Sequence, residues 1–264
     1  MNYFFVPENE FYFYKNGSVF KRGKFAEDKI FSGAKSPFCV KKRDGKIHVI
    51  AVNNDNSVIY IGEKKHSLCR LKKEIEVKRI YMAGRIMGFL MSVLYKDEFL
   101  LIHCVMGDKA QPAVIGKMQN EYFYADDERV YYTNKNGVLG FSELGDGKPD
   151  RFIRIADNAV YPHVYNYKKK EYISYKKADK IYINYAPKIT APECRGAYLT
   201  FCGEEFVIAW NDGRNVMIAD VDKPEKVTRI RCTGNSDICY VSDGYNEFFT
   251  YTPFLEKTVR KKEL

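Results

Sequence analysis

A weak internal repeat constrains the fold of this chain more than any other feature. In each copy a tight polar turn joins two short apolar strands, and a charged residue opens the second one. Seven positions fit, beginning at Glu10, Lys46, Glu98, Arg129, Glu171, Glu205 and Glu247. Their spacings are 36, 52, 31, 42, 34 and 42 residues, with a mean of 39.5. A unit that recurs at this interval predicts an all-β repeat protein made of small antiparallel sheets.

The segments between the strands carry the residues that tight hairpins need. Asn and Gly tolerate positive φ, and they gather at Lys15–Gly17, Asn53–Asn56, Asn134–Gly137 and Asn211–Gly213. A third strand follows such turns, as at Ser57–Ile61 and Val216–Ala219. Three units add a basic fourth strand, at Val77–Ile80, Phe152–Ile155 and Val227–Ile230. A charged outermost strand suits the exposed edge of a sheet.

In its period, turns and strand number the chain resembles a β-propeller, whose blades recur every roughly 40–45 residues. The resemblance is to the architecture only, because the WD dipeptide, the kelch double glycine and the sialidase Asp-box are absent. It implies one domain over residues 1–264. Seven compact blades fit the length, and six longer ones fit if one position is miscounted. We expect strands from the two chain ends, the first at Tyr3–Val6, to pair in one blade, because closing the ring removes free sheet edges.

Composition excludes several classes of protein. Hydrophobic residues make up 45% of the chain, which excludes a disordered chain, and no apolar run is long enough to span a membrane. The N-terminus lacks the features of a secretory signal, so we expect a cytoplasmic protein. The frequent Lys, Asn, Ile and Tyr suggest an AT-rich bacterial source. The seven cysteines form no C-x-x-C pair, which favours reduced, buried thiols. With the nucleotide-binding Gly-rich motifs also absent, we expect no metal and no cofactor.

Candidate binding residues lie in segments expected to share one face, namely the loops between blades and the turns between second and third strands. Binding residues concentrate on loops held by a rigid scaffold. Five residues stand out: Arg85 and Arg195 as anion clamps, His163 as an acid–base group in a loop after Pro162, and Trp210 with Asp212 as a sugar-stacking pair. The structural alternative is that the arginines are solvated turn residues, Trp210 packs on a neighbouring blade, and Asp212 belongs to a hairpin turn.

Three functions follow from this fold. The first is a monomeric, non-enzymatic binding module for a protein or a glycan, acting through the loop face at the channel mouth. The second is a carbohydrate-active hydrolase or lyase with carboxylates at that mouth, although a single Trp and no Asp-box count against it. The third is nucleic-acid binding through basic turns such as Lys168–Lys170, next to Tyr165 and Tyr167. A net charge of +9 with interspersed acidic residues makes nucleic acid the least favoured partner.

Overall fold

The computed structural model describes residues 11–22, 26–43, 45–83, 88–105, 111–144, 151–194, 197–202, 205–212, 214–231, 237–241, 247–251 and 256–260. In this part of the chain all regular secondary structure is β-strand, 25 strands in total. None of the described residues forms a helix that could cross a membrane. The prediction of an all-β chain is confirmed.

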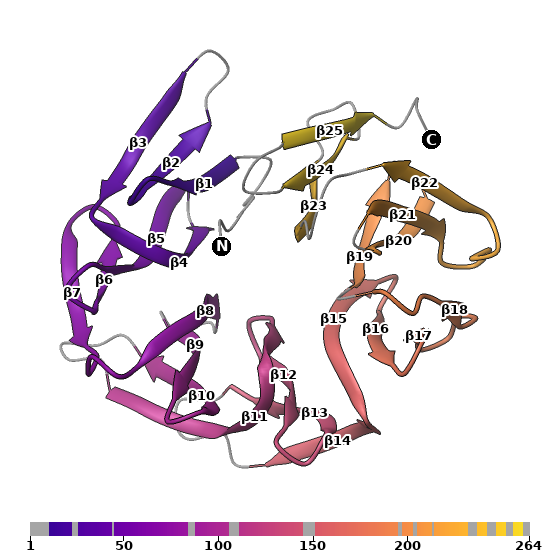
Figure 1. Ribbon diagram of the computed structural model, residues 1–264, viewed down its shortest axis with the longest axis horizontal. Helices are drawn as coiled ribbons and strands as arrows, with labels where there is room; N and C mark the ends of the chain where they lie inside the picture. The colour runs from indigo at the N-terminus through magenta and orange to yellow at the C-terminus, as the bar shows by residue number, and fades with distance from the viewer. Residues whose placement is uncertain are drawn as a thin grey trace. The chain divides into compact units, whose positions relative to one another are not determined.

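The described strands form six sheets (Figure 1). The first two sheets are β1 (Phe11–Lys15), β2 (Ser18–Arg22) and β3 (Glu27–Ser32), and β4 (Ala34–Arg43), β5 (Lys46–Asn53), β6 (Ser57–Ile61) and β7 (Lys65–Arg70). The third comprises β8 (Glu76–Ala83), β9 (Gly88–Tyr95), β10 (Glu98–Val105), β11 (Gln111–Ala125), β12 (Arg129–Asn134), β13 (Val138–Glu143) and β14 (Phe152–Asp157). The fourth comprises β15 (Ala159–Tyr167), β16 (Lys170–Lys177), β17 (Lys180–Ile183) and β18 (Ile189–Thr190). The last two are β19 (Ala197–Cys202), β20 (Glu205–Asn211), β21 (Asn215–Asp220) and β22 (Val227–Arg231), and β23 (Asp237–Val241), β24 (Glu247–Tyr251) and β25 (Glu256–Arg260).

The seven-stranded sheet consists of two four-stranded halves that share the long strand β11. The first half of β11 pairs with β10, from Gln111 opposite Val105 to Met118 opposite Phe99. The second half pairs with β12, with Phe123 opposite Tyr132 and Ala125 opposite Val130. The register shifts between Met118 and Phe123. One strand therefore serves as the outermost strand of one sheet and the first strand of the next.

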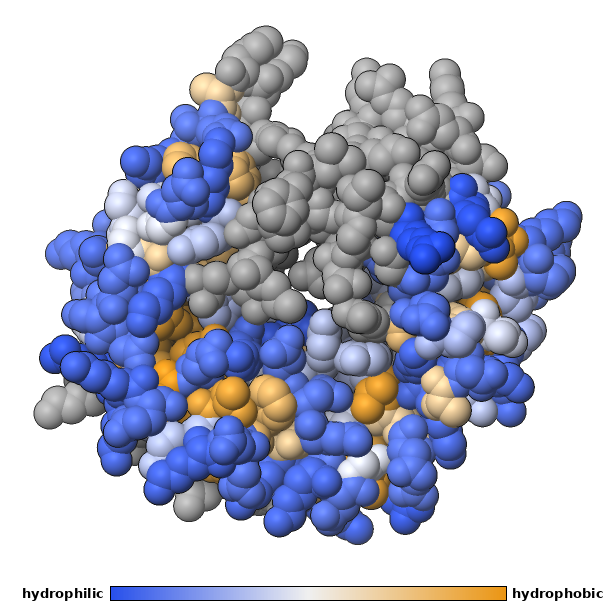
Figure 2. Space-filling view, viewed as in Figure 1, coloured by the Kyte–Doolittle hydropathy of each residue, from blue (hydrophilic) through white to orange (hydrophobic). Residues whose placement is uncertain are grey.

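Contacts divide the chain into two compact units, residues 1–136 with 140–155 (unit 1) and residues 137–139 with 156–264 (unit 2). Within unit 1, neighbouring sheets pack face to face, and successive residues of β5 belong to different cores. Val49 and Ala51 pack with residues of β1–β3, whereas Ile50 and Val52 pack with residues of β8–β10. Within unit 2, β17 and β18 pack on β19–β21 in the same way. On the face drawn in Figure 2, hydrophobic residues are visible within β8–β11 and hydrophilic residues cover the edge strand β7.

Two of the predicted strand positions are wrong. The repeat position at Glu98 begins β10, the third strand from β8, and not a second strand. The polar turn before it, Tyr95–Glu98, joins β9 to β10 and has the composition of the turns that precede the second strands elsewhere. The basic segment Val77–Ile80 lies in β8, the first strand of its sheet, whereas Phe152–Ile155 and Val227–Ile230 lie in the outermost strands β14 and β22, as predicted.

Four cysteines, those whose side chains the structure describes, behave as small apolar side chains. Cys39, Cys104 and Cys194 are buried and Cys69 is partly buried, and none of these four forms a disulfide. Burial raises the pKa of Cys39 and of Cys104 to about 12. These thiols are therefore protonated at neutral pH, which confirms the predicted structural role for them.

Candidate binding site

The structure places Trp210 in the core of unit 2 and not on its surface. The residue lies in β20 between Ala197 of β19 and Met217 of β21, with 2% of its surface exposed. Its neighbours in this core include Leu199 and Ile208. The structural alternative of the sequence analysis therefore accounts for Trp210, because a buried indole has no face on which a sugar could stack.

His163 lies in β15, although the sequence analysis placed it in a loop. A register shift between Val160 and His163 and a positive φ of 57° at Tyr161 mark the irregular start of the strand. The partly buried imidazole packs on the ring of Tyr198, 4.4 Å between centroids, and its Nδ1 accepts a hydrogen bond of 3.3 Å from the Leu199 backbone N–H. Burial lowers the pKa of His163 to about 3. The neutral imidazole thus serves as a structural acceptor.

Asp212 closes the turn between β20 and β21. Its carboxylate accepts hydrogen bonds from the backbone N–H groups of Arg214 (2.9 Å) and Asn215 (2.7 Å). Partial burial alone would raise the pKa of this carboxyl, but hydrogen bonds from Asn215 and Arg214 outweigh it and hold the pKa below its usual value. The group is an ionised turn residue. Arg85 and Arg195 lie outside the described residues, so the five predicted side chains are not seen to converge on one site.

The predicted loop face exists in unit 1, and backbone hydrogen bonds hold it together. The β1–β2 turn meets the start of β4, where the Ala34 N–H donates to the Gly17 carbonyl over 2.9 Å. The connection from β3 to β4 meets the β5–β6 turn, where the Asn54 N–H donates to the Gly33 carbonyl over 3.0 Å. Asn56 then bridges this turn to the β7–β8 connection, because its amide donates to the carbonyls of Lys72 and Ile75. The amide of Asn56 therefore serves to hold loops together.

A different group of polar side chains gathers at the opposite end of the β4–β7 sheet, where the β4–β5 and β6–β7 turns lie. We call it the charged end, comprising Lys41, Arg43, Lys46, His48, Tyr60, Glu63, His66 and Asp127. Lys41 and His48 face each other across β4 and β5, and Tyr60 faces His66 across β6 and β7. Cys39 and Ile50, two residues away along the same strands, pack against β8–β10. The strand alternation therefore carries this sheet face from an apolar core to a charged surface.

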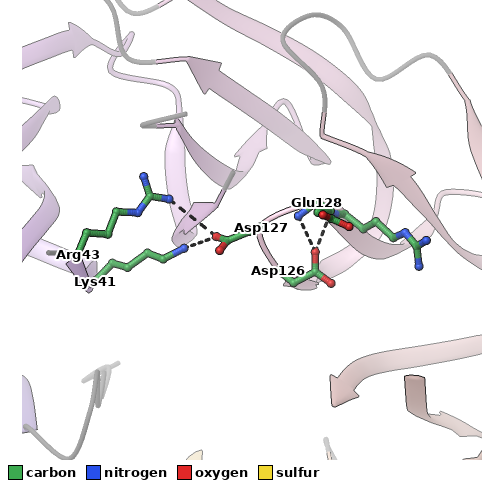
Figure 3. A network of polar contacts seen from close by, with 6 residues as sticks. Lys41, Arg43, Asp126, Asp127 and Glu128 are labelled. Carbon is green, nitrogen blue, oxygen red and sulfur yellow. Dashed lines mark hydrogen bonds and ion pairs between the residues drawn. The ribbon is translucent and has the colours of Figure 1, made fainter. Parts of the chain in front are cut away.

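Asp127 brings the β11–β12 turn to this surface (Figure 3). Its carboxylate forms ion pairs with Lys41 and, at 3.8 Å, with Arg43, both from β4. The adjacent Asp126 accepts hydrogen bonds from the backbone N–H groups of Glu128 (2.8 Å) and Arg129 (2.7 Å), which fixes the turn that presents Asp127. The Lys41 and Arg43 side chains are each 25% exposed and that of Asp127 is 53% exposed, so the contact is open to solvent.

Tyr60 stands between two histidines. Its ring stacks on His48 at 5.8 Å and on His66 at 6.4 Å between centroids, and its hydroxyl hydrogen-bonds to His48 Nδ1. A side chain at Gly62 would meet the Tyr60 hydroxyl at 2.6 Å, so the missing Cβ makes room for the ring. Burial, followed by the charge of Glu63, raises the pKa of Tyr60. Glu63 also pairs with Lys46.

This arrangement supplies hydrogen-bond donors and acceptors of both charges around flat rings, which suits the recognition of a polar ligand. Among the described residues, no group of three His, Cys, Asp or Glu side chains is arranged to hold a metal ion. Sequence analysis missed the charged end because its members lie in the turns between first and second or third and fourth strands or at the strand ends next to them, and because Asp127 is distant in sequence from Lys41. The alternation of Lys41 with Arg43 and of Lys46 with His48 on facing strands was the available signal.

Comparison with known proteins identifies the architecture. No family model matches the chain, and no curated protein matches it either. Among solved structures, Kluyveromyces lactis Hsv2 is 11% identical with a TM-score of 0.66, covering 95% of this chain and 89% of its own. The fold is a β-propeller.

Two further structures resemble this propeller. The AfRom2 CNH domain is 8% identical, with a TM-score of 0.61, covering 97% of this chain and 92% of that domain. The SapL1 lectin in complex with alpha methyl fucoside is 10% identical, with a TM-score of 0.50, covering 88% and 96% of the two chains. At these identities the likeness concerns the fold alone, and the propeller architecture by itself does not specify a ligand.

Proposed function

We propose that this propeller is a non-enzymatic binding module that recognises a protein or a glycan carrying acidic groups. The observation that carries the proposal is the charged end of the β4–β7 sheet. Among the described residues of this end, Lys41, Arg43 and Lys46 outnumber Asp127 and Glu63, and Arg43 offers a planar fork that matches carboxylates. The likeness to a lectin and to other propellers supports a binding role in general terms.

The charged end is a better candidate for the binding surface than the loop face at the channel mouth. Among the described residues of that face, Asn56 and Asp212 hold turns together. The side chains of the charged end are partly or fully exposed and lie in or next to three turns that a ligand could contact together. A monomeric, cytoplasmic protein is part of the same proposal.

We also propose that the propeller has seven blades. Counting the two halves of the β8–β14 sheet separately, the six sheets provide seven units. Closure of the ring through residues 3–6, which lie outside the described residues, completes the proposal.

The test compares binding of the wild type and of a Lys41→Gln, Arg43→Gln double variant to an array of neutral, sialylated and uronic-acid glycans, with immobilised polyglutamate as the protein-like probe. We expect saturable binding to one of the acidic probes and a loss of at least about tenfold in affinity for the double variant, since hydrogen bonds to charged groups contribute about 1.5–3 kcal/mol each. The matched control is Lys72→Gln, at an exposed position of the opposite end. Wild-type protein that binds no probe, or a double variant that binds like the control, contradicts the proposal.

A further inference from the structure

A second surface, in unit 2, combines lysines with aromatic rings. We call it the lysine–tyrosine patch, comprising Tyr167, Lys168, Lys169, Lys170, Tyr172 and Tyr185. Lys168 and Lys169 form the two-residue loop between β15 and β16, with φ values of 47° and 63°. Asn-Gly is the usual pair in such a loop, because both positions need positive φ. Two lysines here hold a strained backbone, and strain of this kind is concentrated at functional sites.

Tyr185 lies two residues after the end of strand β17. The Asn184 side chain accepts a hydrogen bond from the Ile173 N–H (2.6 Å) and donates one to the Glu171 carbonyl (2.8 Å). The backbone N–H of Asn184 also donates to the Ile173 carbonyl over 3.2 Å, so both its side chain and its backbone are bonded to β16. Tyr185 has a positive φ of 65° and is 74% exposed. The hydrogen bonds of Asn184 therefore fix the backbone next to the exposed ring of Tyr185.

The ring of Tyr185 belongs to a continuous aromatic cluster. It meets Tyr172 edge to face at 6.0 Å between centroids, and Tyr172 meets Phe206 of β20 in the same manner at 4.7 Å. Tyr167 packs on the same Phe206 at 5.5 Å. Phe206 itself is buried, so the partly buried rings of Tyr167 and Tyr172 and the exposed ring of Tyr185 stand on an apolar base.

The lysines surround these rings. Lys168 Nζ lies 4.8 Å from the centre of the Tyr167 ring, and Lys170 Nζ lies 5.9 Å from the centre of the Tyr185 ring. Lys168, Lys169 and Lys170 are all exposed. Asp222 is the acidic residue whose charge acts on Lys168. Glu171 alternates to the other face of β16, so the three lysines give the patch a positive charge.

We propose that the lysine–tyrosine patch binds single-stranded nucleic acid, with a base stacked on Tyr185 and phosphates held by Lys168, Lys169 and Lys170. Positive charges beside exposed aromatic rings are the combination that binds single strands without sequence preference, because every base has a flat face and every nucleotide a phosphate. The acidic residues that argue against nucleic acid in the sequence do not weaken this local argument. Asp126 and Asp127, for example, are engaged within unit 1.

The experiment measures fluorescence anisotropy of a labelled oligodeoxythymidine of about 20 nucleotides against the full chain at several salt concentrations. Tyr185→Ala is expected to weaken binding about tenfold, within the range for loss of one stacked base, and Tyr185→Phe to leave it within about twofold. Substituting all three lysines by Gln should reduce the slope of log K against log salt by about 2. The matched control removes charge elsewhere, with Lys72→Gln and Lys73→Gln in unit 1. Circular dichroism and melting temperature verify that each variant is folded.

The outcomes separate nucleic-acid binding from simple attraction of polyanions. Heparin carries no bases, so binding of heparin should fall in the lysine variant but remain unchanged in Tyr185→Ala. Absence of oligonucleotide binding at low salt overturns the proposal, as does a Tyr185→Ala variant that binds the oligonucleotide like the wild type. The result is independent of the charged end in unit 1, because none of these variants alters it.

Discussion

The indole of Trp210 fills a position in the core of unit 2 that smaller side chains would leave partly empty. With 2% of its surface exposed among Leu199, Ile208 and Met217, replacement by Ala removes many packing contacts. We expect Trp210→Ala to lower the free energy of unfolding by about 3–5 kcal/mol, as for other buried aromatic residues. Urea denaturation followed by circular dichroism measures the change. Trp210→Phe should cost less, and an Ala variant within about 0.5 kcal/mol of the wild type would contradict the buried placement.

The imidazole of His163 should make stability depend on pH. Its pKa is about 3 in the folded chain and about 6.5 when unfolded, so between these values the unfolded state binds more protons. The contribution of His163 is complete above pH 6.5 and declines as the pH falls toward 3. From pH 7 to pH 5 the wild type should lose about 1 kcal/mol more than His163→Gln, a value reduced for partial burial.

The measurement is urea denaturation of both proteins at several pH values between 5 and 7. His66→Gln, which removes an exposed imidazole from unit 1, is the matched control and should follow the wild type more closely. Parallel pH profiles for wild type and His163→Gln would show that the imidazole is hydrated in the folded protein.

The sequence predicts which residues lie in turns more reliably than it predicts which residues form a binding site. Asp212 lies in the turn that its Asn-Asp-Gly context predicted, because the carboxylate satisfies N–H groups only two and three residues away. The surroundings of Trp210 and His163 are set by Met217 and Leu199, which contact them from neighbouring strands. No local pattern around either residue encodes those contacts. For the same reason, the sequence did not predict the ion pair between Lys41 and Asp127, which are distant in sequence.

At the scale of strands, β13 and β14 approach too closely for a side chain at Gly140. A Cβ there would lie 2.3 Å from the Ile153 carbonyl oxygen and 2.5 Å from the Phe152 ring. Since the backbone cannot yield as a flexible side chain can, Gly140→Ala should destabilise unit 1 by about 1–3 kcal/mol. Gly116→Ala is the control, because its nearest neighbour, at 3.0 Å, is the hydroxyl at the far end of the Tyr132 side chain and not backbone. Urea midpoints that rank the two variants in the opposite order would contradict this account.

Strand order was harder to predict than strand existence. The second strand of this unit, β9 (Gly88–Tyr95), has no charged residue at its start. The repeat pattern therefore matched the polar turn one strand later, at Glu98. This error produced the uneven spacings of 52 and 31 residues around Glu98.

The apolar residues of β5 show how a strand between two neighbouring sheets differs from one with a single buried face. Apolar residues occupy both faces because each face meets another sheet, so the strand carries a continuous apolar run.

For the whole molecule, the period of the repeat was sufficient to predict a propeller, because each small sheet needs neighbours on both faces to bury its apolar residues. The likeness to solved propellers confirms the architecture. The number of blades and the closure of the ring were not accessible in the same way. Both depend on pairing between segments more than two hundred residues apart, and β1–β3 and β23–β25 each show three strands in the described residues.

Ring closure predicts that a short terminal segment supports the stability of the whole propeller. If residues 3–6 complete a blade, deletion of residues 1–7 exposes a sheet edge and removes one strand from the ring. A loss of about 2–3 kcal/mol would lower the melting temperature by roughly 5–10 °C for a chain of this size. A synthetic peptide of residues 1–7 should restore part of the loss in a concentration-dependent manner, because a ligand of the folded state stabilises it by mass action. If the shortened chain melts at the temperature of the intact one, or if the peptide has no effect on a destabilised chain, closure by this segment is wrong.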